Sequence, residues 1–215
     1  MKNDEDITAA LEFIRTQDPD FAHALTLIQP LPERRRPAGF EHLTKIIIEQ
    51  QVSLASAEAI WQRLSDAVTP FVPERMLGHS EEALRALGLS RQKARYCRAL
   101  AEEIQSNRLL LKTLHEQDDE EVLSQLTNVK GIGRWTAEIY MISCLGRTDI
   151  WPAGDVALQT AFGHLKRLPT RPDAAKMDEM AEPLRPYRTV AARILWRYYA
   201  DVVQAPTRKK SPNKN

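Results

Sequence analysis

Helical periodicity, interrupted by polar capping residues, runs through almost the whole chain and restricts its fold more than any other feature. Ser53, Ser80 and Ser90 each stand before a segment whose apolar residues recur every three or four positions, which is typical of an amphipathic helix that begins at a serine cap. Asp18 followed by Pro19 marks another start, because proline is favoured at the first helical position. No segment alternates apolar and polar residues as a strand does, so the sequence predicts an all-α protein.

The expected helices can be placed along the chain from these signals. They cover residues 43–50, 54–68, 81–87, 91–106, 135–145 and 188–203, with others after Asp18 and after Asp118. In the helix over 54–68, one face carries Leu54, Ala57 and Trp61, and we expect that face to be buried.

Composition excludes several classes of protein. The chain has 215 residues, of which 43% are hydrophobic, enough for one domain or two small ones. Two cysteines, Cys97 and Cys144, cannot build a four-cysteine zinc or iron–sulfur site, and the five histidines contain no pair at metal spacing. The longest apolar runs, such as 46–48, are too short to span a membrane, and the acidic N-terminus does not resemble a signal peptide. We therefore expect a cytoplasmic or nuclear protein.

Charge is unevenly distributed although the net charge is only +1. Residues 1–125 hold 15 Lys and Arg against 21 Asp and Glu, whereas residues 126–215 hold 15 against 8. The basic second part suggests a polyanionic partner, although charge also fluctuates along chains that have none. Residues 206–215 carry four basic residues and no apolar anchor, which predicts a disordered basic tail.

Two of only eight glycines lie two residues apart, at Gly131 and Gly133, between two predicted helices. Glycines allow a tight turn, and the N–H groups at the start of the following helix can bind a phosphate. Residues 126–137 therefore have the layout of a helix–hairpin–helix, which contacts nucleic acid without reading its sequence. As a bare tripeptide, Gly-x-Gly is more often a simple interhelical turn.

A second candidate element lies 22 residues beyond Gly133. Within residues 151–159, a loop that contains proline and glycine ends at Asp155, and a helix begins there. Aspartate is a favoured helix cap, and a carboxylate fixed in this way is also suited to catalysis. The two roles are compatible.

Residues 126–162 resemble the hairpin and catalytic-aspartate region of the helix–hairpin–helix DNA glycosylase superfamily, and in particular the 3-methyladenine DNA glycosylase II family. Two other segments agree with that resemblance: Gln50-Gln51-Val52-Ser53, and the Leu-Gly-Leu-Ser-x-x-Lys pattern that ends at Lys93. The resemblance covers roughly residues 8–203. It implies an all-α fold of two helical lobes within residues 1–205, with the active cleft between the lobes and the hairpin on its rim.

The resemblance also implies a role for particular residues. Asp155 would be the catalytic carboxylate, and Gln50 and Gln51 would belong to the loop that enters the duplex, where Gln51 is the candidate to fill the gap left by an extruded base. Other implied positions are the phosphate-binding amides of Gly131, Gly133 and Thr136 with Lys130 beside them, the base-pocket residues Trp135 and Trp196, and the carbonyls of Thr127, Val129 and Ile132 for a Na⁺ or K⁺ ion. No cofactor is required. Gln51 could equally be an exposed helix-end residue, and the tryptophans could be core residues.

The implied reaction is removal of alkylated purines from double-stranded DNA by a monomeric enzyme, leaving an abasic site. An alkylated purine is already cationic and can leave without protonation, so a single carboxylate is sufficient. Relatives that remove oxidised or mismatched bases often carry a four-cysteine cluster that two cysteines cannot form. A DNA-binding module without catalysis is the alternative, since it needs the hairpin but not Asp155.

Three departures from the family pattern stand out. Lys130 occupies the position before the first hairpin glycine where proline is usual, and Ile139 occupies a position that is aromatic in some relatives. Tyr140, beside Ile139, falls on a different helical face, which puts its place in the base pocket in doubt. The N-terminal β-rich domain of some relatives is not expected here.

Overall fold

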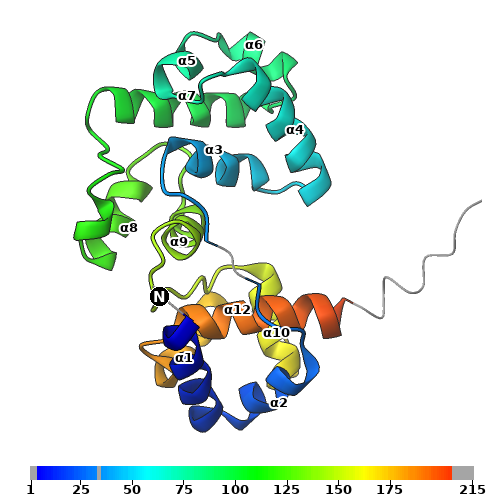
Figure 1. Cartoon of the computed structure of the whole chain (residues 1–215). Coiled ribbons are helices and arrows are strands. Elements are labelled where there is room, and N and C mark those ends of the chain that lie inside the picture. The colour runs from blue at the N-terminus through cyan, green and yellow to red at the C-terminus, as the bar shows by residue number, and fades with distance from the viewer. Residues whose placement is uncertain (1–3, 33–34, 205–215) are drawn as a thin grey trace, which may run out of the picture. The chain divides into compact units, whose positions relative to one another are not determined.

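The structure is a computed structural model that describes residues 4–32 and 35–204, and every regular element in those ranges is a helix (Figure 1). The prediction of an all-α protein is confirmed for this part of the chain. The chain divides into two compact units, one formed by residues 1–34 and 146–215 and the other by residues 35–145. The tail predicted over 206–215 lies outside the described residues.

The unit formed by residues 35–145 is built around α3. Its helices are α3 (Phe40–Glu49), α4 (Leu54–Ala67), α5 (Pro73–Leu77), α6 (Glu81–Ala86), α7 (Arg91–Gln105), the short 3₁₀ helix η1 (Leu114–Glu116), α8 (Asp119–Thr127) and α9 (Arg134–Ser143). Three successive residues of α3, Ile46, Ile47 and Ile48, are completely buried. A helix that is apolar on several faces belongs inside a core, and α3 packs against α4, α7 and α9.

The unit formed by the two ends of the chain contains α1 (Asp4–Gln17), α2 (Pro19–Leu27), α10 (Val156–Leu165), α11 (Ala174–Ala181), the 3₁₀ helix η2 (Glu182–Leu184), α12 (Arg188–Tyr198) and the π-helical turn η3 (Tyr199–Val203). Helix α12 packs against α1, α2 and α10 (Figure 1). Phe21, Phe162 and Trp151 meet edge to face or tilted in its core. Lys166 joins the end of α10 to Asp18 and Asp20 through ion pairs of 2.5 and 2.9 Å.

The predicted helix caps are confirmed. The hydroxyls of Ser53, Ser80 and Ser90 each accept a backbone N–H three residues ahead at 3.2 Å, and Asp18 accepts the N–H of Asp20 at 3.0 Å. Pro19 occupies the first turn of α2 as expected. No helix among the described residues is both long and apolar enough to cross a bilayer.

Two details of the helix predictions are wrong. Leu54 is 80% exposed rather than buried, because it is the first residue of α4 and projects beyond the packed part of that helix. The predicted helix over residues 188–203 is α-helical only to Tyr198, and its last five residues form a π-helical turn.

Candidate active site

The turn between α8 and α9 carries the two closely spaced glycines. Helix α8 ends at Thr127, the N–H of Ile132 donates to the carbonyl of Val129 at 3.0 Å, and Gly133 is the residue at which α9 begins. The first bond of α9 runs from the N–H of Ala137 to the carbonyl of Gly133 at 3.1 Å, and no side chain caps the helix. This is a helix–hairpin–helix, and its second helix starts at a residue with no side chain of its own.

Gly131 and Gly133 are glycines for different reasons. Gly131 has a φ of +96°, which side chains rarely allow, and an added Cβ would lie 2.1 Å from the Cγ of Tyr96. Gly133 has an ordinary φ of −84°, and an added Cβ would meet no atom within 4 Å. The fold therefore requires glycine at Gly131, whereas the empty space at Gly133 is available to a ligand.

A side chain from the end of α3 braces this hairpin. The amide nitrogen Nε2 of Gln50 donates to the carbonyl of Gly131 at 3.2 Å and to Oγ1 of Thr136 at 2.7 Å. Thr136 is only 2% exposed, so its hydroxyl is buried and does not face the solvent. Its predicted contribution to phosphate binding through the backbone amide is unaffected by this bond.

Gln51 differs from Gln50 in exposure and in backbone conformation. It is exposed and has a φ of +54°, in the left-handed region that is uncommon for residues other than glycine. Two apolar side chains within the next three residues are also exposed, Val52 with an exposed fraction of 38% and Leu54 with one of 80%. Of the two glutamines expected to enter the duplex, Gln51 is the one that presents its side chain to solvent.

Helix α7 holds the other side of this arrangement. Nζ of Lys93 donates to the carbonyl of Ile48 at 2.7 Å, in the last turn of α3, where the helix dipole favours a cation. Lys93 is 9% exposed, and burial lowers its pKa from the ordinary lysine value. One turn further along α7, the ring of Tyr96 packs against Gly131.

Asp155 stands at the start of α10, in the unit formed by the chain ends. Its Oδ1 accepts the N–H of Leu158 at 2.8 Å, and its own N–H donates to the carbonyl of Pro152 at 2.9 Å. Two buried side chains fix the loop before it: Nε1 of Trp151 donates to the carbonyl of Met177 at 3.1 Å, and Nε2 of Gln159 donates to the carbonyl of Ala153 at 2.8 Å. The result is a half-buried carboxylate on a rigid loop.

Comparison with known proteins identifies the family to which this arrangement belongs. Residues 44–186 match the model of the family described as HhH-GPD superfamily base excision DNA repair protein. The chain is 33% identical over 169 residues to DNA-3-methyladenine glycosylase 1 of Schizosaccharomyces pombe, covering 77% of this chain and 73% of that protein. The chain belongs to the 3-methyladenine DNA glycosylases of the HhH-GPD superfamily.

Solved structures of this family have the same fold. The S. pombe 3-methyladenine DNA glycosylase in complex with abasic DNA superposes with a TM-score of 0.80 at 28% identity, over 87% of this chain and 95% of that one. A DNA-3-methyladenine glycosidase from Bacillus halodurans gives a TM-score of 0.80 at 32% identity, over 91% of both chains. The resemblance inferred from the motifs is therefore confirmed at the level of sequence and of fold.

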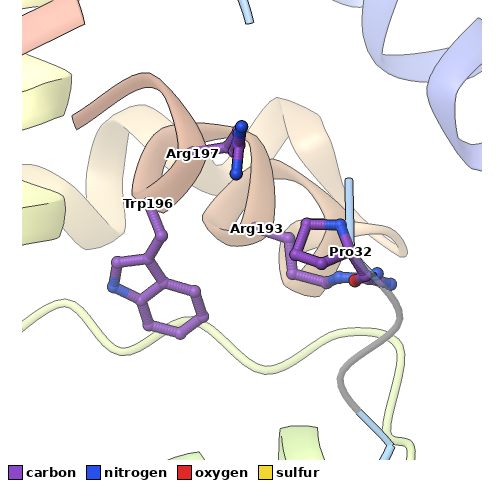
Figure 2. Close-up of a pocket in the computed structure, with 4 residues that line it drawn as sticks. All are labelled: Pro32, Arg193, Trp196 and Arg197. Carbon is purple, nitrogen blue, oxygen red and sulfur yellow. Dashed lines mark hydrogen bonds between the residues drawn. The ribbon is translucent and has the colours of Figure 1, made fainter. Parts of the chain in front are cut away.

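The two tryptophans expected in the base pocket of this glycosylase are both half-buried. Trp135 lies in the first turn of α9, and Trp196 lies on α12 beside a small pocket that is also lined by Pro32, Arg193 and Arg197 (Figure 2). Arg193 donates to the carbonyl of Pro32 at 2.7 Å. A cavity of about 10 Å³ is close to the smallest that holds a water molecule, so this pocket is not itself a purine site. Base stacking by either tryptophan stays a prediction.

Tyr140 belongs to the core. It is completely buried, its hydroxyl accepts the N–H of Gly39 at 2.9 Å, and burial raises its pKa above the ordinary value. The sequence placed it on a different face from Trp135, and its burial agrees with that placement.

The remaining predicted residues all lie in the hairpin. Lys130 is exposed at its tip. The carbonyl of Val129 already accepts the N–H of Ile132, but a carbonyl oxygen has a second lone pair for a cation. Cation binding there by Thr127, Val129 and Ile132 stays a prediction. The described residues contain no cluster of three or more His, Cys, Asp or Glu side chains that could hold a metal ion.

Sequence reasoning missed three contributors to this site. The brace from Gln50, the packing of Tyr96 on Gly131 and the exposure of Leu54 depend on tertiary contacts. The only signal for Leu54 was its position directly after a serine cap, because the first turn of a helix often projects from the packed face.

Proposed function

We propose that this protein is a DNA glycosylase that hydrolyses the N-glycosidic bond of alkylated purines, of the 3-methyladenine and 7-methylguanine type, in double-stranded DNA. The observation that carries the proposal is Asp155, a carboxylate fixed by backbone bonds at a helix start, in a chain of this family. The uncapped start of α9 supplies the DNA-binding element. The protein acts as a monomer.

Binding begins at the DNA backbone. Amides at the start of α9, with Lys130 beside them, hold a phosphate and position the duplex without reading its sequence. The damaged nucleotide leaves the stack at a cost of a few kcal/mol. Gln51, exposed beside the hairpin-bound Gln50, fills the gap that remains.

Asp155 then stabilises the reaction at the sugar. As the bond between C1′ and the base nitrogen breaks, the sugar gains oxocarbenium character, and a fixed carboxylate lowers the energy of that charge. A cationic purine leaves with the bonding electrons as a neutral base, so no second acid is needed. Stacking on Trp135 or Trp196 would add about 0.5–2 kcal/mol of cation–π attraction to the charged base.

Water is the nucleophile in this scheme. Relatives that also cut the strand use a lysine two residues after the second hairpin glycine, and this chain has Trp135 there. Lys130 lies in the turn before its first glycine and is exposed, whereas a lysine nucleophile must be desolvated to be neutral near pH 7. The product is an intact strand with an abasic site. A Na⁺ or K⁺ ion on the carbonyls of Thr127, Val129 and Ile132 would stiffen the turn, and no step of the reaction requires it.

The decisive experiment incubates the protein with methylated duplex DNA and identifies the released bases. Release of free methylated purines is expected, and DNA binding without release would identify a binding module instead. Borohydride added during turnover should trap no protein–DNA adduct, and strand breaks should appear only after heat or alkali. A trapped adduct would mean that an amine, not water, attacks C1′.

A further inference from the structure

The two adjacent glutamines after α3 have different environments, and that difference assigns them different tasks. Gln51 is exposed, whereas the Gln50 side chain makes two hydrogen bonds to the hairpin. We propose that Gln50 is a positioning residue that fixes Gln51 relative to the hairpin, so that Gln51 and the phosphate-binding amides at the start of α9 contact the same stretch of duplex. The inference rests on the proposed function of those two elements.

The first argument is the geometry of the Gln50 amide. Its Nε2 reaches the carbonyl of Gly131, within the turn, at 3.2 Å and the hydroxyl of Thr136, in the first turn of α9, at 2.7 Å. One amide group therefore spans the turn and the start of the helix that follows it. Hydrogen bonds in a partly buried site of this kind are stronger than those in water.

The second argument is the backbone of Gln51. Its φ of +54° lies in a region that a glutamine occupies only when the surrounding structure imposes it. The residue directly before it is held by the hairpin, and Ile48 is held by Lys93 at 2.7 Å. These anchors leave the short segment between α3 and α4 little freedom to relax.

The third argument is that α7 secures each partner of the Gln50 contact at a separate point, so both partners stay folded without that contact. Lys93 secures the last turn of α3, and Tyr96, one turn away, packs on Gly131. In the part of the chain that the structure describes, Gln50 provides the side-chain hydrogen bonds between the segment 50–53 and the hairpin. Loss of the Gln50 hydrogen bonds should therefore make the position of Gln51 relative to the hairpin less fixed, while both segments stay folded.

The test compares Gln50→Met, which keeps the side-chain length but has no donor, with Gln50→Lys, which restores a donor. Gln62→Met is the matched control, because Gln62 is exposed and its side-chain amide donates to Asp66, one helical turn away on the same helix. Fluorescence anisotropy gives the Kd for intact duplex divided by the Kd for abasic duplex, which measures the preference for abasic DNA. Gln50→Met should lower this preference about tenfold with little change for intact DNA, and Gln50→Lys should recover most of it.

The same substitution is then made in a Gln51→Ala background. If Gln50 acts through Gln51, adding Gln50→Met to Gln51→Ala should lower the preference by less than about twofold further. Full additivity, or an unchanged preference in Gln50→Met alone, would overturn the proposal. Thermal unfolding of each variant shows whether it remains folded.

Hydrogen–deuterium exchange gives a measurement that uses no DNA. Gln50→Met should speed exchange over residues 50–53 and over 129–134 together, whereas Gln62→Met should change neither. Unchanged exchange in both segments would contradict the coupling even if the enzyme is active. Absence of base release by the wild-type protein, with coupled exchange intact, would instead refute only the proposed function.

Discussion

Helices α9 and α10 begin in opposite ways. The N-cap residue of α9 is Gly133, which brings no side chain, and no side chain caps that helix. The N-cap residue of α10 is Asp155, whose carboxylate accepts the N–H of Leu158 at 2.8 Å. Both helix starts favour negative charge, because N–H groups without intrahelical partners and the helix dipole point outward there.

The difference shows how one structural element serves two functions. A helix start without a capping side chain leaves its amides available to an anion from outside, which suits a DNA phosphate. A helix start capped by aspartate already has an anion, which the backbone holds in one place for use on a developing cation. Exchanging the features of the two helix starts should therefore damage binding in one case and catalysis in the other.

The largest effect is expected for Asp155→Asn. Asparagine can still accept the N–H of Leu158, so the cap is kept while the charge is removed. Single-turnover excision from methylated DNA should fall by roughly two to three orders of magnitude, as when one preorganised electrostatic group is lost. The Kd for abasic DNA should stay the same or decrease.

Asp173→Asn is a matched control for that change. Asp173 caps α11 by accepting the N–H of Lys176 at 2.8 Å, the same geometry at an exposed position. It should leave excision unchanged. Near wild-type excision by Asp155→Asn would remove the basis for a catalytic carboxylate.

The next effect is expected for Gly133→Asp, which gives α9 the same kind of start as α10. Nothing lies within 4 Å of the added Cβ, and aspartate is a good cap, so the melting temperature should hold or rise slightly. The new carboxylate occupies the phosphate position, and Kd should increase about 10–100-fold for damaged and intact duplexes alike. Gly133→Ala, which adds bulk without charge, should bind more tightly than Gly133→Asp. Unchanged affinity of folded Gly133→Asp would show that the hairpin is only a turn.

Local signals in the sequence were sufficient to predict most of the helices, though not α5 or α11, together with the caps and the position of Asp155 as a capping residue. Serine, aspartate and proline act within three or four residues of their own position, so their effects can be recognised without knowledge of the fold. The family motifs then identified the hairpin, and the comparisons confirmed the family.

The brace around the hairpin could not be predicted in the same way. Gln50 bonds to residues 81 and 86 positions later, and such a contact has no periodic signature. Leu54 fitted the apolar face of α4 by spacing but is exposed, because spacing defines a face and not how far packing extends along it. The reason for the Gly-x-Gly pattern also required the structure, since Gly131 differs from Gly133 in its positive φ and in its contact with Tyr96.

A third prediction tests that distinction through stability. Gly131→Ala must place a side chain at a φ of +96° and against Tyr96, so the free energy of unfolding should fall by about 1–2 kcal/mol. Denaturant unfolding measures the change, and Gly133→Ala should cost much less. In a Tyr96→Ala background the steric part is removed, so Gly131→Ala should cost less there than in the wild type. An equal cost in both backgrounds would assign the whole requirement to backbone conformation.

The smallest effect is expected for Lys130→Gln. Lys130 is exposed at the hairpin tip, where the family usually has proline, and we expect it to add one phosphate contact without affecting the amides at the start of α9. The slope of log K against log salt should become shallower by about 0.9, so the Kd for any duplex should rise about eightfold near 0.1 M salt and be nearly unchanged near 1 M. Excision by saturating enzyme should not change, because Lys130 acts on binding and Asp155 on the sugar.

Lys112→Gln removes the same charge at an exposed position outside the hairpin and should leave the slope less affected. Equal slopes for the two variants would mean that Lys130 contributes only to the overall charge of the protein.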